Sequence, residues 1–383
     1  MSATSTGKIE ELESIRGVAA LLVVFFHMPT WNPQLHAIRF IHNSYYMVDL
    51  FFVLSGFVMN LNYGERLRNL RDLAQFQFLR LGRLYPVHLL FLLLAVAAAG
   101  SSWIAAAFGL HIPNGTAFKD ATVASFIEQL LLVHSLGFFK IEHPFNLPSW
   151  SISVEFYTYL LFGLMCLIAI RWLRLSLFVI AAAAALTLLY LDLGAIANFS
   201  DVLQCLAGYF LGCLAAWFAM RHPHALPRGS TLAALAAMAV FLCLRTAPQF
   251  DVAIFLLSAA LILAVVCSPD DFAKAALRHP VLKFFGLISY SIYMSHTLML
   301  WVCNQFVRVV LRRPEAIAEG ISTPQLPLGA ALLWYGIAVG STIALSALVF
   351  KYVEDPFRLK SKEYARRFRA PRAAVPGPAA GTG

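Results

Sequence analysis

Residues 12–28, LESIRGVAALLVVFFHM, are the most informative stretch for the fold. Two ionisable residues in it flank an apolar run of the kind found in membrane helices. The run from Val18 to Phe26 is apolar throughout, yet Arg16 precedes it and His27 closes it. An α-helix turns about 100° and rises about 1.5 Å per residue, so Arg16 and His27 project from nearly the same face, about 16 Å apart along the axis. The stretch predicts a membrane helix with a cation at one edge and an acid–base group deep in the bilayer.

The composition of the whole chain predicts an all-α polytopic membrane protein. Of its 383 residues, 60% are hydrophobic and only 13% are charged. Spanning segments must satisfy their backbone hydrogen bonds internally, and the apolar runs are too long for barrel strands, so helices are expected. The net charge of +9 does not predict nucleic-acid binding, because the cations cluster between and after the apolar runs, as orientation signals do.

Ten stretches are apolar enough to be predicted as transmembrane helices. With a cytoplasmic N-terminus, ten crossings put roughly three times as many cations inside as outside, so both termini are predicted to be cytoplasmic. We expect a membrane domain over residues 1–360 and a disordered basic, Pro/Ala/Gly-rich tail over 361–383. The predicted spans are residues 14–31, 46–63, 84–108, 149–170, 175–193, 201–220, 230–246, 251–267, 284–307 and 329–350.

One further apolar stretch is too short and too polar at its ends to be a predicted span. It runs from Val123 to Phe139 in the long connection between the third and fourth spans, and it contains Glu128 and His134. This pattern predicts an interfacial or re-entrant helix.

Two more arginines lie near the predicted cytoplasmic boundary, in FQFLRLGRLYP just before the third span. Arg80 and Arg83 are three residues apart and share a helical face. Together with Arg16 they could form a three-arginine cluster, and guanidinium groups suit phosphate oxygens. The alternative is an ordinary cytoplasmic loop whose arginines contact lipid phosphates.

An acidic partner for His27 is predicted in NLPSWSISVEFYTYL, which enters the fourth span. Glu155 lies about 9 Å below the outer surface and His27 about 10 Å below it, for a core about 30 Å thick. A carboxylate at that depth could orient the imidazole and stabilise its protonated form. The alternative for His27 is a core histidine that donates to a backbone carbonyl.

Other polar residues in the predicted spans are candidates for the lining of a pocket. His296 lies in GLISYSIYMSHTL, an unusually polar span whose hydroxyls could instead bond to neighbouring helices. No HExxH, CxxC or P-loop pattern occurs, so no metal site is predicted. The candidate pocket residues are Asp49, Ser55, Trp150, Ser153, Tyr157, Tyr293 and His296.

Six blocks of the sequence, in order, resemble the acyltransferase 3 family of integral membrane acyltransferases. The chain is similar to the stand-alone form of that family, without a fused SGNH domain after the last helix. The blocks are RGVAALLVVFFH (Arg16–His27), DLFFVLSGFVM (Asp49–Met59), RLGRLYP (Arg80–Pro86), LPSWSISVEFYTY (Leu147–Tyr159), GLISYSIYMSH (Gly286–His296) and VEDPF (Val353–Phe357).

The resemblance implies a ten-helix enzyme of the bacterial inner membrane. It would move an acyl group, often acetyl, from cytoplasmic acyl-CoA to a hydroxyl of a surface or exported polysaccharide or glycolipid. His27 matches the family's essential histidine and Glu155 its acidic residue in the fourth helix. Arg16, Arg80 and Arg83 match its arginines, which implies contacts to acyl-CoA as co-substrate, with no bound cofactor.

The sequence leaves the mechanism and two other functions open. His27 could act as general base, with His296 or Tyr293 assisting the oxyanion, or it could form a transient acyl-histidine. A multi-pass transporter could use the same buried ionisable groups as a proton or anion path. A non-catalytic scaffold of a polysaccharide assembly complex is the other alternative.

Overall fold

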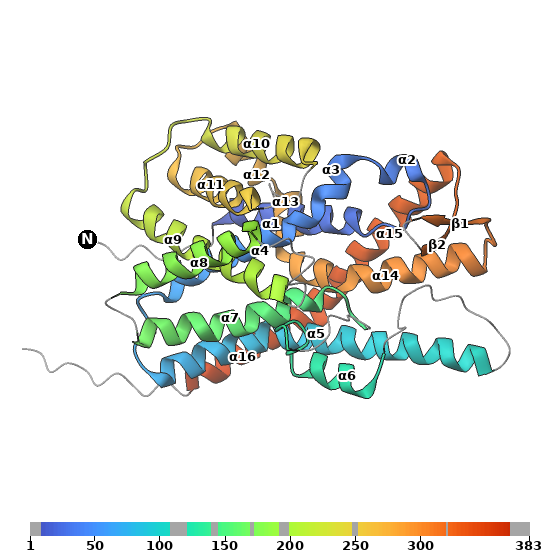
Figure 1. Cartoon of the computed structure of the whole chain (residues 1–383), viewed down its shortest axis with the longest axis horizontal. Helices are drawn as coiled ribbons and strands as arrows, with labels where there is room; N and C mark the ends of the chain where they lie inside the picture. The colour runs from blue at the N-terminus through green and yellow to red at the C-terminus, as the bar shows by residue number, and fades with distance from the viewer. Residues whose placement is uncertain are drawn as a thin grey trace, which may run out of the picture.

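A computed structural model shows a largely helical protein in which one short hairpin interrupts the helices (Figure 1). The helices are α1 (Glu10–Phe26), α2 (Pro33–His36), α3 (Arg39–His42), α4 (Met47–Tyr63), α5 (Leu70–Ala107), α6 (Val123–Leu130), α7 (Ser149–Ile168), α8 (Leu173–Tyr190), α9 (Ser200–Arg221), α10 (Ser230–Leu244), α11 (Ala253–Cys267), α12 (Phe272–Leu277), α13 (Pro280–Leu287), α14 (Ser289–Val309), α15 (Leu328–Val349) and α16 (Asp355–Arg367). A 3-10 turn, η1 (Asn43–Tyr46), precedes α4, and a π-helical turn, η4 (Phe350–Glu354), joins α15 to α16. The structure describes residues 9–107, 121–138, 145–168, 172–190, 199–246, 252–318 and 321–367.

Each of the ten predicted spans contains a helix of the structure. Among the described residues, five helical segments are long and apolar enough to cross a membrane, and three more apolar helices are shorter. The five are Arg39–Tyr63, Leu70–Ser101, Ser149–Ile168, Ser200–Arg221 and Leu328–Arg367. An α-helical membrane protein is therefore confirmed, whereas the number of ten crossings and the cytoplasmic termini stay predictions.

The third predicted span begins too late, because α5 starts at Leu70 rather than at residue 84. Arg80 and Arg83 therefore lie inside a continuous helix and not in a cytoplasmic loop, and Pro86 is also within that helix. Membrane helices tolerate proline where neighbouring groups satisfy the backbone. The two arginines lower the mean hydropathy of this part of α5, so a hydropathy profile misses it. They are tolerated within the helix because they line a protein cavity.

Two other predicted boundaries are also wrong. Only Val123–Leu130 of the predicted interfacial helix is helical, and the chain then turns through Leu132, whose φ is +58°. The predicted disordered tail begins inside α16, because residues 361–367 are helical and Ser361 and Ala365 are buried. The rest of the predicted tail lies outside the described residues.

The connection between α14 and α15 contains strands that the sequence analysis did not predict. Strand β1 (Glu315–Ala318) pairs antiparallel with β2 (Ile321–Pro324), with Glu315 opposite Pro324. Arg308 fixes the hairpin to the end of α14, because it donates to Glu315 at 2.9 Å and to the carbonyl of Ser322 at 2.6 Å.

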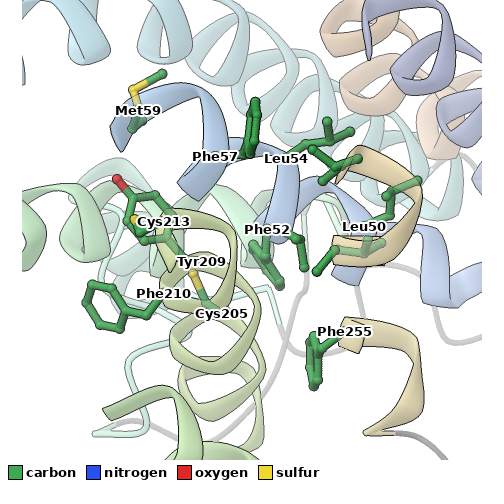
Figure 2. Packing of buried hydrophobic residues seen from close by; sticks show 14 of the residues in the cluster. Leu50, Phe52, Leu54, Phe57, Met59, Cys205, Tyr209, Phe210, Cys213 and Phe255 are labelled. Atoms are coloured by element: carbon green, nitrogen blue, oxygen red, sulfur yellow. The ribbon is translucent and has the colours of Figure 1, made fainter. Parts of the chain in front are cut away.

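The packing of α4 against α9 forms the centre of the main hydrophobic core (Figure 2). Phe52 and Phe57 of α4 and Tyr209 of α9 are each at most 1% exposed. Glycines set how closely the two backbones approach. A β-carbon on Gly56 would overlap the carbonyl of Tyr209, and one on Gly212 would overlap the carbonyl of Val53. The absence of a side chain at Gly56 therefore permits the close packing of α4 against α9.

We expect Gly56→Ala to lower the stability of the protein by about 1–3 kcal/mol, the usual cost of overpacking a core. The matched control is Gly336→Ala in α15, where a β-carbon would meet no atom within 4 Å. That control should leave stability unchanged or raise it by up to about 1 kcal/mol through helix propensity. Thermal unfolding in detergent measures both. Equal melting temperatures for the two variants would contradict the close contact of α4 with α9.

Candidate active site

Three arginines and one glutamate from three helices line a common internal cavity, which we call the arginine cavity. Arg16 comes from α1, Arg80 and Arg83 come from α5, and Glu155 comes from α7. Arg16 also lies within electrostatic range of Glu155 and Arg83. The cavity has a volume of about 70 Å³. Three cations here face one lining carboxylate, so the cavity has the charge to accept an anion.

Arg80 shows most directly that this cavity has spare hydrogen-bonding capacity. Its side chain is buried, its Nη1 is 3.5 Å from the sulfur of Met59, and its guanidinium carbon is 5.7 Å from the ring centroid of Tyr63. Among the described residues, its Nε has no hydrogen-bond partner. Buried donors are nearly always paired in native proteins, so this one points to a group that binds in the cavity.

A chain of hydroxyl groups holds Glu155 in the arginine cavity. The hydroxyl of Tyr159 donates to Oε1 of Glu155 at 2.6 Å, and it lies 2.7 Å from Oγ of Ser55. Tyrosine has a single hydroxyl proton, so Ser55 must donate to the oxygen of Tyr159. Glu155 is thereby oriented by its own helix and by α4.

A second cavity, of about 220 Å³, contains both candidate histidines, and we call it the histidine cavity. His27 ends α1 and His296 is buried in α14. Their rings lie with centroids 4.9 Å apart, and Nε2 of His296 is 3.3 Å from Nδ1 of His27. Asp49 and Trp150 complete the part of this lining that the sequence analysis predicted.

Backbone carbonyls assign the protons of the two histidines. Nδ1 of His296 is 2.7 Å from the carbonyl oxygen of Tyr293, and Nδ1 of His27 is 3.0 Å from that of Val23. A carbonyl only accepts, so both Nδ1 atoms carry the proton in the neutral rings. Nδ1–H of His27 is then shared, because Nε2 of His296 accepts the second, longer branch of a bifurcated hydrogen bond whose first branch goes to Val23. The unprotonated nitrogen of His27 is its Nε2, on a ring that lines the histidine cavity.

The two cavities adjoin, since Val48 and Tyr293 line both of them. The hydroxyl of Tyr293 is 2.9 Å from Oγ of Ser151, which lines the arginine cavity. The arrangement therefore places a cationic compartment next to a compartment with a neutral imidazole.

The predicted pairing of His27 with Glu155 is not what the structure shows. The residue within hydrogen-bonding distance of His27 is His296, whereas Glu155 lies among the arginines and accepts from Tyr159. Counting residues gave both side chains a similar depth, but it could not give the direction in which each helix presents them. The predicted proximity of Arg16 to Arg80 and Arg83 does occur, and Ser55, Tyr293, Asp49, Trp150 and His296 line one or both cavities as predicted.

Two predicted pocket residues on α7 have a different position. Ser153 and Tyr157 line neither cavity; instead their hydroxyls donate to the carbonyls of Leu132 at 2.6 Å and Leu131 at 3.1 Å. On α7, Ser151, Ile152, Glu155 and Tyr159 line the arginine cavity, and positions 153 and 157 lie about 200° around the helix from Ser151 and Glu155.

Glu354, in the VEDPF block, is a buried carboxylate near the arginine cavity that was not among the predicted site residues. Glu354 is 4% exposed, accepts from Oγ of Ser291 at 2.7 Å, and lies within electrostatic range of Arg83 and Arg16. A glutamate at the end of an apolar helix was the available signal. Within the described part of the chain, no group of three or more His, Cys, Asp or Glu residues could hold a metal ion.

Comparisons with known proteins identify relatives over nearly the whole chain. A family model described as an acyltransferase domain matches residues 9–351. The putative peptidoglycan O-acetyltransferase YrhL of Bacillus subtilis is 24% identical over 402 residues, which cover 94% of this chain and 56% of that protein. Peptidoglycan O-acetyltransferase OatA of Listeria monocytogenes is 22% identical over 388 residues, covering 91% of this chain and 56% of OatA. The chain thus spans little more than half the length of these two relatives.

A shorter similarity covers 22% of the chain. Protein 2 in picA locus of Rhizobium radiobacter is 43% identical over 88 residues, which are 43% of its own length. No solved structure matches the chain.

Proposed function

Because the chain belongs to the acyltransferase 3 family, we propose that it is a membrane O-acyltransferase that acts on a cell-surface or exported carbohydrate. The relatives named as peptidoglycan O-acetyltransferases support acetyl as the group and a polysaccharide or glycolipid as the acceptor. The donor proposed from the site is acyl-CoA on the cytoplasmic side of the bacterial inner membrane. Lipid surrounds the apolar helices.

The observation that carries this proposal is the contact between the two cavities. Acyl-CoA is an anionic thioester on a long pantetheine arm, and the arginine cavity offers three guanidinium groups, one with an unpaired Nε. The acceptor hydroxyl is neutral and must lose a proton, and the histidine cavity offers an imidazole with a free Nε2.

The proposed reaction joins the two compartments in one transfer. Nε2 of His27 takes the proton of the acceptor hydroxyl while the hydroxyl oxygen bonds to the thioester carbonyl carbon. The carbon–sulfur bond then breaks. The thiolate that is released takes up the proton from Nε2 of His27 and leaves as free CoA. The carbonyl of Val23 and Nε2 of His296 together keep His27 in the required tautomer, which is the orienting role predicted for Glu155. Glu155 instead balances charge among the arginines.

The arginines provide a test of the donor assignment. We expect Arg80→Ala and Arg83→Ala to raise the KM for acyl-CoA about 10- to 100-fold each, because each removes a charge-assisted hydrogen bond. The KM for the carbohydrate acceptor should change far less. Steady-state kinetics of the purified protein, with each substrate varied in turn, measures both constants. Equal changes in the two KM values would remove the arginine cavity from the donor site.

Transport is tested with the same preparation. Protein reconstituted in vesicles with radiolabelled acetyl-CoA and a carbohydrate acceptor should place the label on the carbohydrate. Uptake of an unmodified substrate with no label transferred would instead show a transporter. Normal glycan acylation in cells that carry a correctly inserted His27→Ala variant would show a scaffold.

A further inference from the structure

The helix α16 presents a row of cations beside the arginine cavity. Arg358, Lys362 and Arg366 are spaced four residues apart and therefore follow one face of this helix. Lys362 lies within electrostatic range of Arg358 and Arg366, and also of Arg80 and Arg83. Five cations thus converge where α16 meets α5. We call Arg358, Lys362 and Arg366 the basic row.

Close contacts hold α16 against the first half of α5 (Figure 1). A β-carbon on Gly82 would lie 2.5 Å from that of Ser361, and Gln75 donates to the carbonyl of Ala365 at 3.0 Å. The rings of Phe78 and Tyr364 lie 5.8 Å apart. The basic row is next to this buried seam, so its position relative to Arg80 and Arg83 is fixed by packing.

The basic row carries positive charge that the described residues neutralise only in part. Arg358 is paired with Asp355. Lys362 and Arg366 form no ion pair with any described residue, and both are exposed. Like charges held this close repel one another, so such a cluster is stabilised by an anion of several charges.

We infer that the basic row of α16 binds the phosphorylated nucleotide head of acyl-CoA, and in particular its 3′-phosphate. This inference rests on the proposed function and adds a donor subsite outside the arginine cavity. Coenzyme A carries its phosphates at one end and its thioester at the other end of an extended arm. With the 3′-phosphate on α16, the diphosphate of the donor would lie at the guanidinium groups of Arg80 and Arg83, and the arm would pass through the arginine cavity and present the thioester toward His27.

The test compares acetyl-CoA with acetyl-dephospho-CoA, which lacks only the 3′-phosphate. The wild-type protein should prefer acetyl-CoA by about tenfold in KM, the scale of one charge-assisted phosphate contact. The double variant K362A/R366A should lose most of this preference through a higher KM for acetyl-CoA. Titrations of CoA and dephospho-CoA should show the same loss in Kd, which provides a readout that does not depend on catalysis.

The matched control is Lys360→Ala, on the same helix. Lys360 is exposed, lies about 200° around the helix from Arg358, and is 5.9 Å from the ring of Phe357. This variant should keep the full preference for acetyl-CoA. A wild-type protein without the preference, or a double variant that retains it, would overturn the basic row as a nucleotide site. Absence of acyl transfer and of CoA binding in the wild type would instead overturn the proposed function.

Discussion

Replacing His27 with alanine is expected to lower the rate of acyl transfer by about 10²–10⁴-fold, the usual contribution of a general base. Acyl-CoA binding should persist, because Arg16, Arg80 and Arg83 line the adjoining cavity and not the histidine cavity. The measurement is kcat of the purified variant together with its Kd for CoA. A variant that transfers at the wild-type rate would exclude His27 as the base.

The residue that orients His27 can be identified with a matched pair of variants. His296→Leu removes the second acceptor for Nδ1–H of His27 and leaves only the carbonyl of Val23, whereas His296→Gln retains an amide oxygen that can accept. We expect a loss of kcat smaller than that of His27→Ala for the leucine variant and partial recovery in the glutamine variant, with an altered pH dependence of kcat in both. If Glu155→Gln alone altered that pH dependence, Glu155 would orient His27, as the sequence analysis expected.

The sequence predicted the helices because each depends on a local apolar run. Its errors occur where tertiary contacts decide the outcome. Arg80 and Arg83 interrupt the apolar pattern of α5, but they stay helical because they face a cavity. The four-residue strands β1 and β2 are stabilised by Arg308 and by each other, and so short a pair carries little signal of its own.

The sequence also predicted most of the candidate site but not its internal pairing. The eleven-residue spacing of Arg16 and His27 gave one helix with two polar groups, and each group does line a cavity. Depth along the membrane normal follows from residue counts, whereas the rotation of one helix about its axis relative to another does not. Glu155 was therefore assigned to the wrong neighbour. His296 was found as a pocket residue, but its contact with His27 requires the fold.

The charge balance of the arginine cavity leads to the second large expected effect, that of Glu155→Gln. Removing this carboxylate takes away one of the negative charges within electrostatic range of the half-buried Arg16, whose other acidic neighbours are Glu13 and Glu354. Losing a charge partner costs about 1 kcal/mol at an exposed site and about 3–5 kcal/mol at a fully buried one, so we expect the melting temperature to fall in Glu155→Gln and also in Arg16→Gln. Thermal unfolding in detergent and acyl transfer should be measured on the same samples.

The double variant R16Q/E155Q separates the structural role of these residues from their role in catalysis. It removes both charges together and leaves neither without the other, so its loss of stability should be smaller than the sum of the single losses. Acyl transfer should not recover, because the cavity then has one guanidinium fewer to hold the phosphates of the donor. Strictly additive melting temperatures would show that Arg16 and Glu155 do not interact. Recovery of transfer together with stability would show that Arg16 is needed for folding alone and not for binding acyl-CoA.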